Sequence, residues 1–423
     1  MVRSDTGPVA RYLADLHARL AKNTDGNAAD YIPELAEVDV DRFGIAIATA
    51  DGEVYVAGDS EVPFTLQSLS KPFAYGYALH RHGRDVVREH VGVEPTGDAF
   101  NAILLDEENN RPFNPMVNAG AIAVCELFEG PTQDARRAAM RDFFSRFAGR
   151  DLALNDRVQQ SEAESGHRNR AIAYMMLNAG MITRPPDEVL DIYVRQCSLE
   201  VTTRELAMMG ATLANGGVHP LTGDRLLRPG EVRDVLSVMT TCGMYDFAGE
   251  WVFEVGIPAK SGISGGIVAV LPGQISIGIF SPPIDEHGHS VRGIAACREI
   301  SREFGLHLLG EHEDPQAVIL LEEAGDVVVL ELQGPLYFGS VERLLRRVRA
   351  LSDEVEELVL DFERVRDADA AAIRLLELLV ASPDTERPRL VLRGLGKEQL
   401  GPLRAALEQT ADRATVGFDG GAD

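Results

Sequence analysis

The 423-residue chain has few of the features that mark secreted or membrane-spanning proteins. It contains only four cysteines, none of them in a C-x-x-C pair: Cys125, Cys197, Cys242 and Cys297. Scattered cysteines and the lack of a recognisable signal peptide predict a reducing, cytoplasmic setting. No run of 18 apolar residues is present, so we expect no membrane-spanning segment.

Positive charge and histidine are also scarce. The chain has 41 Lys and Arg against 66 Asp and Glu, which gives a formal net charge of −25. An acidic surface repels phosphate backbones and anionic membranes, so nucleic-acid and membrane binding are disfavoured. The ten histidines include the pairs His80/His82 and His287/His289, but neither pair belongs to a clustered set of metal ligands. We therefore expect no metal and no other cofactor.

Strand-like segments occur at both ends of the first 310 residues, with helical segments between them. One pair of β-rich runs flanks Asp51-Gly52 and another flanks Pro272-Gly273, which predicts two hairpins. Apolar residues at helical spacing predict helices over 135–147, 168–178, 186–196, 203–214 and 290–309. These elements predict an α+β domain over residues 1–310, in which a helical subdomain flanks one antiparallel sheet.

The chain changes character at the polar segment 311–316, which contains a proline and is predicted to be a linker. Short strand-like runs then alternate with helical segments, which predicts a small α/β domain over residues 317–423. Strands are expected over 318–322, 327–332, 358–360 and 390–392, and helices over 341–351, 371–380 and 400–408. The tail from Gly417 is expected to be frayed.

Ser68 and Lys71 form the most informative pair in the sequence. Three residues apart on a helix, they share a face, so the amine can approach the hydroxyl. A lysine that burial has made neutral can take the serine proton and activate the oxygen as a nucleophile. Pro72 is tolerated only near a helix start, which places the helix N-terminus, a site suited to an oxyanion, beside Ser68. The short S-x-x-K pattern also fits an ordinary helix start with a solvated lysine.

Four further segments are polar and rich in small residues, as expected of a binding site. They are 114–121 with Asn118, 161–169 with Glu162 and Asn169, 242–247 with Tyr245, and 258–266 with Lys260-Ser261-Gly262. The last resembles the K-T-G element of S-x-x-K enzymes. Each segment alone has an ordinary alternative: a helix-capping role for Asn118, a capping box for 161–169, a packed aromatic for Tyr245, and a glycine-rich turn for 258–266. Their occurrence together, in this order and spacing, is much less expected by chance.

Together these segments resemble the serine-dependent glutaminases, a family with a β-lactamase-like fold. The matching stretches, in family order, are 31–36, 67–71, 114–122, 162–169, 213–217, 242–247 and 258–266. They cover nearly all of residues 25–300. The resemblance implies hydrolysis of L-glutamine to L-glutamate and ammonia through an acyl-serine (γ-glutamyl) intermediate, without cofactor or metal. It also implies a homodimer or homotetramer.

The resemblance implies a role for each matching residue. Ser68 matches the nucleophile, Lys71 its partner base, and Tyr245 a tyrosine that assists proton transfer. Ile263 matches a position, usually valine, whose backbone N–H resembles an oxyanion hole together with that of Ser68. The residues that bind or line the substrate are then Tyr31, Ser68, Asn118, Glu162, Asn169, Tyr193, Tyr245 and Ile263. Glutamine is a zwitterion, so Glu162 suits its ammonium group, and amide and tyrosine groups suit its carboxylate.

From about residue 317 the chain resembles a STAS domain of the anti-sigma-factor-antagonist type. The segments 336–340, 358–361 and 367–373 carry this looser match. Many such domains have a phosphorylatable serine after an aspartate at a helix start, but here Asp369 is followed by three alanines. A phosphate switch at that position is therefore not expected. What remains is an interaction or assembly role, or a vestigial domain, and the sequence names no partner.

Two other functions remain open on the sequence. One is a penicillin-interactive acyl-serine hydrolase on the same scaffold, which is disfavoured because no S-D-N triplet lies in the helical region. The other is a non-enzymatic glutamine sensor with the STAS domain as its output. Turnover of a chromogenic cephalosporin would favour the first, and normal signalling by a Ser68→Ala protein would favour the second.

Overall fold

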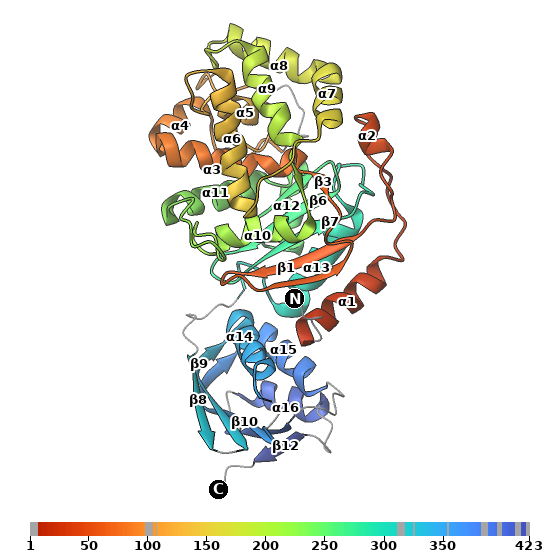
Figure 1. Cartoon of the computed structure of the whole chain (residues 1–423), viewed down its shortest axis with the longest axis vertical. Coiled ribbons are helices and arrows are strands. Elements are labelled where there is room, and N and C mark those ends of the chain that lie inside the picture. The colour runs from red at the N-terminus through yellow and green to blue at the C-terminus, as the bar shows by residue number, and fades with distance from the viewer. Residues whose placement is uncertain are drawn as a thin grey trace. The chain divides into compact units, whose positions relative to one another are not determined.

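The computed structural model describes residues 7–97, 105–106, 108–310, 318–324, 326–352, 355–381, 388–395, 400–410 and 416–419. The described residues form two compact units, each containing a five-stranded sheet (Figure 1). One unit comprises residues 16–298, and the other combines the described parts of 1–15 and 299–423. The predicted linker over 311–316 lies outside the described residues, so the domain boundaries stay predictions.

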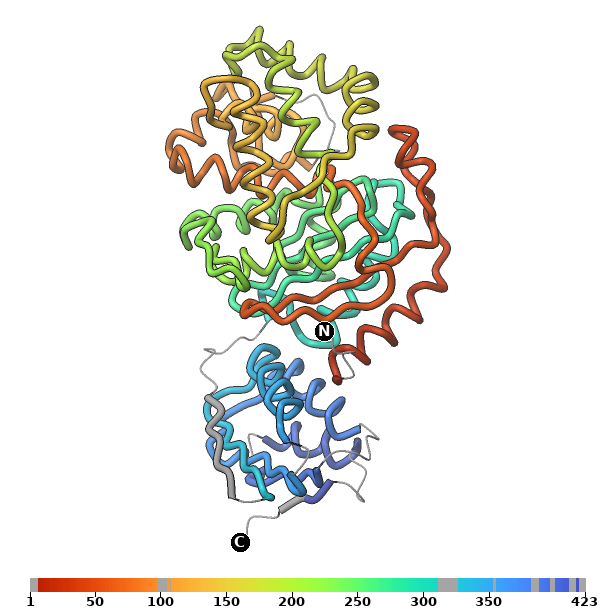
Figure 2. Tube along the Cα trace, viewed as in Figure 1, coloured from red at the N-terminus to blue at the C-terminus, as the bar shows by residue number. Residues whose placement is uncertain are grey.

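The sheet of the larger unit is assembled from both ends of that unit (Figure 2). Its order is β2-β1-β7-β6-β5, and every neighbouring pair is antiparallel. The strands are β1 (Gly44–Thr49), β2 (Val54–Gly58), β5 (Ala259–Gly262), β6 (Gly266–Leu271) and β7 (Ile275–Phe280). Both predicted hairpins are present. Gly52 and Gly273 supply the left-handed backbone of the two turns, at φ 100° and 75°.

Helix α10 (Thr203–Ala214) packs on this sheet against β1, β6 and β7. A small-residue cluster allows the close approach: Ala46, Ala48, Ala207, Met208 and Ala211. A Cβ atom at Gly278 of β7 would lie 2.7 Å from the backbone nitrogen of Ala207, so the contact requires glycine there. The helix begins at a capping box in which Thr202 and Glu205 each accept the backbone N–H of the other.

A helical subdomain fills the sequence between β2 and β5, as the apolar spacing predicts. Its helices are α3 (Lys71–His82), α4 (Arg84–His90), α5 (Asn118–Cys125), α6 (Gln133–Ala148), α7 (Asp156–Ser165), α8 (His167–Asn178), α9 (Pro186–Cys197), α11 (Pro229–Cys242) and α12 (Ala248–Glu254). The short strands β3 (Phe64–Thr65) and β4 (Glu200–Val201) pair antiparallel within it. Helices α1 (Pro8–Leu20), α2 (Pro33–Ala36) and α13 (Val291–Phe304) flank this central part of the sequence.

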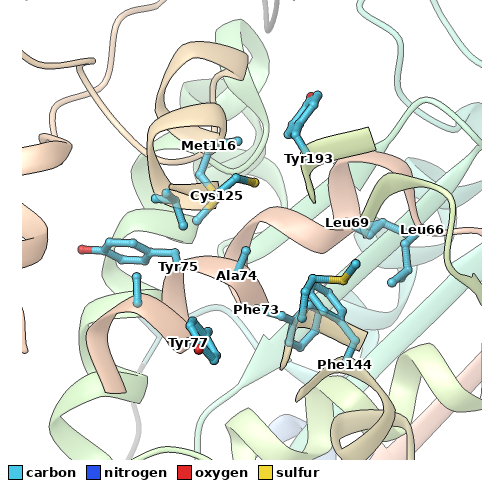
Figure 3. Packing of buried hydrophobic residues seen from close by; sticks show 14 of the residues in the cluster. Leu66, Leu69, Phe73, Ala74, Tyr75, Tyr77, Met116, Cys125, Phe144 and Tyr193 are labelled. Atoms are coloured by element: carbon cyan, nitrogen blue, oxygen red, sulfur yellow. The ribbon is translucent and has the colours of Figure 1, made fainter. Parts of the chain in front are cut away.

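The core of the subdomain surrounds α3. The buried ring of Phe73 meets that of Phe144 edge-on, with centroids 6.3 Å apart (Figure 3). It meets the ring of Phe147 in the same way at 5.1 Å. Such aromatic pairs add to the stabilisation that burial of their area provides. This packing holds the start of α3, and with it the Ser68 turn, in a fixed position.

The sheet of the smaller unit has the order β12-β11-β10-β9-β8 and is parallel except for the pair β8–β9. Its elements are β8 (Val318–Ala324), β9 (Val327–Leu336), α14 (Phe338–Arg349), β10 (Glu357–Ala368), α15 (Ala370–Val380), β11 (Arg389–Arg393), α16 (Gly401–Thr410) and β12 (Val416–Asp419). The expectation of a frayed tail is wrong for 417–419, because these residues pair in parallel with β11. Among the described residues, no helix is long and apolar enough to cross a membrane.

Candidate active site

Ser68 lies in a 3₁₀ turn, η1 (Gln67–Ser70), that leads directly into α3. Pro72 occupies the first turn of α3, where its missing N–H has no intrahelical partner to lose. Gln67, immediately before Ser68, has a φ of 48°. A left-handed backbone is unfavourable for a residue other than glycine and persists only where the surrounding structure enforces it. The backbone strain therefore lies at Gln67, the residue that sets the orientation of Ser68.

The amine of Lys71 is buried among oxygen atoms. Its Nζ donates to the carbonyl of Met116 at 3.0 Å, to Oδ1 of Asn118 at 2.7 Å and to the hydroxyl of Tyr245 at 3.4 Å. Burial lowers the pKa of Lys71 to about 7, because the charged form loses its hydration. The Tyr245 hydroxyl also makes a hydrogen bond to Ser68. These contacts connect the lysine to the serine through the tyrosine.

Tyr245 has a strained backbone and lies against a second buried lysine. The residue begins the 3₁₀ turn η2 (Tyr245–Phe247) with a φ of 55°. Lys260 Nζ lies 3.8 Å from the centroid of its ring and donates to the carbonyls of Gly243 and Ser261 at 2.9 and 2.7 Å. Burial and the nearby charge of Lys71 hold the pKa of Lys260 well below its usual range. The K-S-G element was expected on a strand beside the site, and it lies on β5, but Lys260 itself was given no role.

One pocket gathers the residues expected to bind the substrate. It is lined by Tyr31, Gln67, Ser68, Asn118, Glu162, Asn169, Tyr193, Cys197, Tyr245, Ser261, Ile263 and Gly288. Each predicted substrate residue is in this set, and Lys71 lies behind it in contact with Asn118 and Tyr245. Cys197 and Gly288 carried no signal in the sequence. Within the described residues, no group of three His, Cys, Asp or Glu side chains is placed to hold a metal ion.

A carboxylate and two amides form the polar wall of the pocket. Burial raises the pKa of Glu162 to about 7, although the neighbouring polar side chains of Gln67 and Tyr31 favour the charged form. Nδ2 of Asn118 donates to Oδ1 of Asn169 at 2.9 Å, and the Tyr193 hydroxyl donates to Oδ1 of Asn118 at 3.3 Å. The helix-cap alternative is wrong for Asn118, because the N-cap of α5 is Val117. The capping box is also wrong for 161–169, because the N-cap of the helix that begins there, α8, is Gly166, with no side-chain cap hydrogen bond.

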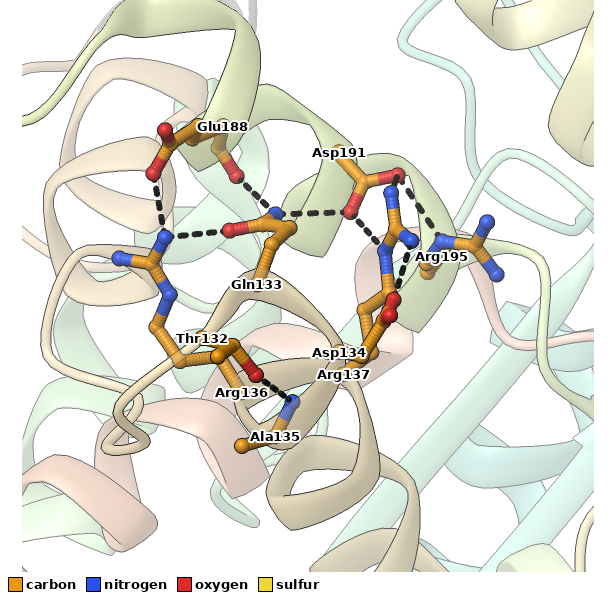
Figure 4. A network of polar contacts seen from close by, with 9 residues as sticks. All are labelled: Thr132, Gln133, Asp134, Ala135, Arg136, Arg137, Glu188, Asp191 and Arg195. Atoms are coloured by element: carbon orange, nitrogen blue, oxygen red, sulfur yellow. Dashed lines mark hydrogen bonds and ion pairs between the residues drawn. The ribbon is translucent and has the colours of Figure 1, made fainter.

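Helix α9, which carries Tyr193, is fixed to α6 by a polar network (Figure 4). Asp191 accepts hydrogen bonds from Gln133 at 2.8 Å, Arg137 at 2.7 Å and Arg195 at 2.9 Å. Burial alone would raise the pKa of Asp191, but these three donors hold it below its ordinary value. Residues two apart point to nearly opposite sides of a helix. The network therefore anchors one side of α9 and leaves Tyr193 on the pocket side.

Comparison with known proteins identifies both parts of the chain. Residues 26–309 match the Glutaminase family and residues 318–406 match the STAS domain. The glutaminase of Trichormus variabilis is 53% identical over 301 residues, which are 71% of this chain and 90% of that protein. Glutaminase 2 of Bradyrhizobium diazoefficiens is 43% identical over 410 residues, 92% of this chain and 66% of that protein.

Solved structures give the same result. The L-glutamate binding form of Mglu has a TM-score of 0.71 at 38% identity and covers 95% of this chain and 100% of that one. The probable glutaminase YbaS has a TM-score of 0.70 at 40% identity, with coverage of 72% and 99%. Fold and relatives define an amidohydrolase with a β-lactamase-like fold. The chain belongs to the glutaminase family and carries a C-terminal STAS domain. The predicted family, fold class and enzyme class are confirmed.

Proposed function

We propose that Ser68, Lys71 and Tyr245 carry out the glutaminase reaction, the hydrolysis of L-glutamine to L-glutamate and ammonia. The observation that carries this proposal is the chain of contacts from the buried Lys71 amine to Tyr245, and from Tyr245 to Ser68. It ends at a pocket that also contains a buried carboxylate. A pKa of about 7 lets Lys71 accept a proton and return it at neutral pH.

In the first half of the reaction, the oxygen of Ser68 attacks the side-chain amide carbon of glutamine. Its proton passes to the Tyr245 oxygen while the tyrosine proton passes to the amine of Lys71. Burial raises the pKa of Tyr245, so the phenol stays protonated and acts as a relay. Backbone N–H groups of Ser68 and Ile263 suit the developing oxyanion. The same relay, run backwards, protonates the amide nitrogen of the substrate, which leaves as ammonia.

In the second half, water attacks the γ-glutamyl ester. Lys71 again accepts a proton through Tyr245, now from the water, and returns it to the oxygen of Ser68 as L-glutamate leaves. Each half restores the charge of the lysine, so the cycle needs no group besides these side chains and water. One proton is taken up and one is returned in each half, so a single relay through Tyr245 is sufficient.

Glu162 is the proposed partner of the substrate ammonium group. It is buried in the pocket wall, so an approaching positive charge stabilises its ionised form. Asn118, Asn169 and the hydroxyls of Tyr31 and Tyr193 supply polar groups for the substrate carboxylate. A form of Mglu binds L-glutamate, which supports an amino-acid ligand of this size. A site that pairs every polar group of its ligand rejects analogues lacking one of them.

Ammonia release by the purified protein tests the proposal. We expect L-glutamine to be hydrolysed, L-asparagine to be hydrolysed far more slowly, and Ser68→Ala to release no ammonia while it keeps the circular dichroism of the parent. Ser237→Ala is a matched control, because its exposed hydroxyl on α11 donates to the Arg233 carbonyl at 2.7 Å, outside the pocket. Ammonia release by Ser68→Ala would exclude Ser68 as the nucleophile. Turnover of a chromogenic cephalosporin in place of glutamine would favour the penicillin-interactive alternative.

We further propose that the protein works in the cytoplasm as a homodimer or homotetramer, with the STAS domain in an interaction or assembly role. The four cysteines are buried and free, which suits a reducing compartment. The N-cap of α15 is Asp369, whose Oδ1 accepts the N–H of Ala372 at 2.7 Å. No hydroxyl follows it that could be phosphorylated. Light scattering of the intact chain tests the assembly.

A further inference from the structure

A tight turn beside Tyr245, formed by residues 285–289, contributes to the wall of the substrate pocket. The backbone N–H groups of His287 and His289 both donate to Oδ1 of Asp285, at 3.0 and 2.9 Å. The N–H of Asp285 in turn bonds the carbonyl of His289 at 2.9 Å. Gly288 lies within this turn at a φ of 82° and lines the pocket. A movement of the turn therefore changes the shape of the pocket.

The residue that follows Tyr245 is bonded to this turn. Oδ2 of Asp246 lies 3.0 Å from Nδ1 of His287. Aromatic rings stack beside the pair, with centroids 6.1 Å apart both for Phe247 and His287 and for Tyr245 and His289. The two segments are thus joined by a hydrogen-bonded carboxylate–imidazole pair and by ring contacts that reach the relay tyrosine.

We propose that Asp246 and His287 form a charge-dependent clamp that positions Tyr245 and Gly288 around the substrate. The clamp rests on the proposed function, since it acts on the relay of that reaction. Tyr245 needs such support, because its left-handed backbone must be held by neighbouring structure. Neither member of the pair lines the pocket, so both are positioning residues.

The clamp is strongest at acid pH. Asp246 on η2, with Asp285 and Glu286 on the turn itself, raises the pKa of His287 above its ordinary value of 6.5. The other histidine of the turn does not switch with it, because burial lowers the pKa of His289 to about 4. His287 is therefore charged below its raised pKa. The attraction is lost as the pH rises through that value.

The experiment compares kcat/KM for glutamine between the parent and His287→Gln at about pH 6 and about pH 9. Both side chains are partly exposed, so we expect a deficit of about two- to fivefold at the lower pH and none at the higher. Asp246→Asn should give the same deficit, and the double variant should fall no further. His80→Gln is the matched control, because His80 also pairs with a carboxylate at 3.0 Å, that of Glu231, outside the pocket.

His287→Lys provides a second readout, because its charge persists at alkaline pH. We expect its kcat/KM at about pH 9 to stay above that of His287→Gln, whereas the kcat/KM of the parent no longer does. A deficit of equal size at both pH values, an additive double variant, or the same pH-dependent deficit in His80→Gln would overturn the clamp. If the parent released no ammonia at all, the proposed function itself would be wrong, a result distinct from these.

Discussion

Replacement of Lys71 by methionine tests the acid–base argument most directly. Methionine keeps an unbranched, slightly shorter side chain and removes the amine. The fall in the pKa of Lys71 from 10.5 to about 7 corresponds to roughly 5 kcal/mol against its charged form. It raises the neutral fraction at pH 7 from about 0.03% to about half, a gain of roughly a thousandfold. We expect the variant to release no ammonia.

The same burial predicts that Lys71→Met, although inactive, is more stable than the parent at neutral pH. Between about pH 7 and 10.5 the unfolded chain binds more protons at Lys71 than the folded chain, so the parent gains stability as the pH rises. Lys71→Met lacks this dependence. At pH 7 the variant avoids the penalty of roughly 5 kcal/mol for burying the amine. It also leaves the oxygens of Met116 and Asn118 without a donor, at a cost of about 1–3 kcal/mol. The variant should therefore be more stable than the parent by about 2–4 kcal/mol. The difference should shrink as the pH approaches 10.5.

Two measurements check these statements. The pH profile of kcat reports groups in the substrate complex, so it should rise through a midpoint near 7 and then level. Urea unfolding at several pH values gives the stability difference. A kcat that does not change across neutral pH would refute the role of a neutral Lys71. A Lys71→Met protein less stable than the parent at pH 7 would refute the account of its burial.

Three further predictions concern other parts of the structure. Glu162→Gln should raise KM for glutamine at least about tenfold, and KM of the parent should fall as the pH rises through about 7, where Glu162 ionises; a KM independent of both would contradict its role. Tyr245→Phe should lower kcat by about a hundredfold with little change in KM, because it removes the relay oxygen; an unchanged kcat would exclude the relay. Phe73→Ala should cost about 3–5 kcal/mol of unfolding free energy in urea, because its ring is fully buried, whereas a loss below 1 kcal/mol would show that the core around α3 collapses to fill the space.

Much of the fold was predictable because local signals agree with the tertiary structure. Asp51-Gly52 and Pro272-Gly273 mark turns whose flanking strands pair as hairpins. Helical spacing identified α6, α8, α9 and α10. Strand β12 was missed because it is short and its Gly417 and Asp419 disfavour strands, so that pairing with β11 decides its conformation.

The pocket was predictable where residue types and spacing carry chemistry, as at Ser68 and Lys71. Other features depend on tertiary contacts that no local pattern reveals. The left-handed backbone of Gln67 and Tyr245 is enforced by surrounding structure. The contact between Asp246 and His287 joins residues that are far apart in the chain, and His287 was considered only as a metal ligand.

The depth of the two lysines beside Tyr245 has a consequence for behaviour in concentrated salt. Both amines are almost completely shielded from solvent, so mobile ions cannot gather around them. Dissolved ions screen exposed charges within about 8 Å at physiological ionic strength, but they screen interior groups much less. Proton transfer among these side chains should therefore be almost unaltered at high salt concentration. The attraction between the partly exposed Asp246 and His287 should instead be weakened by screening.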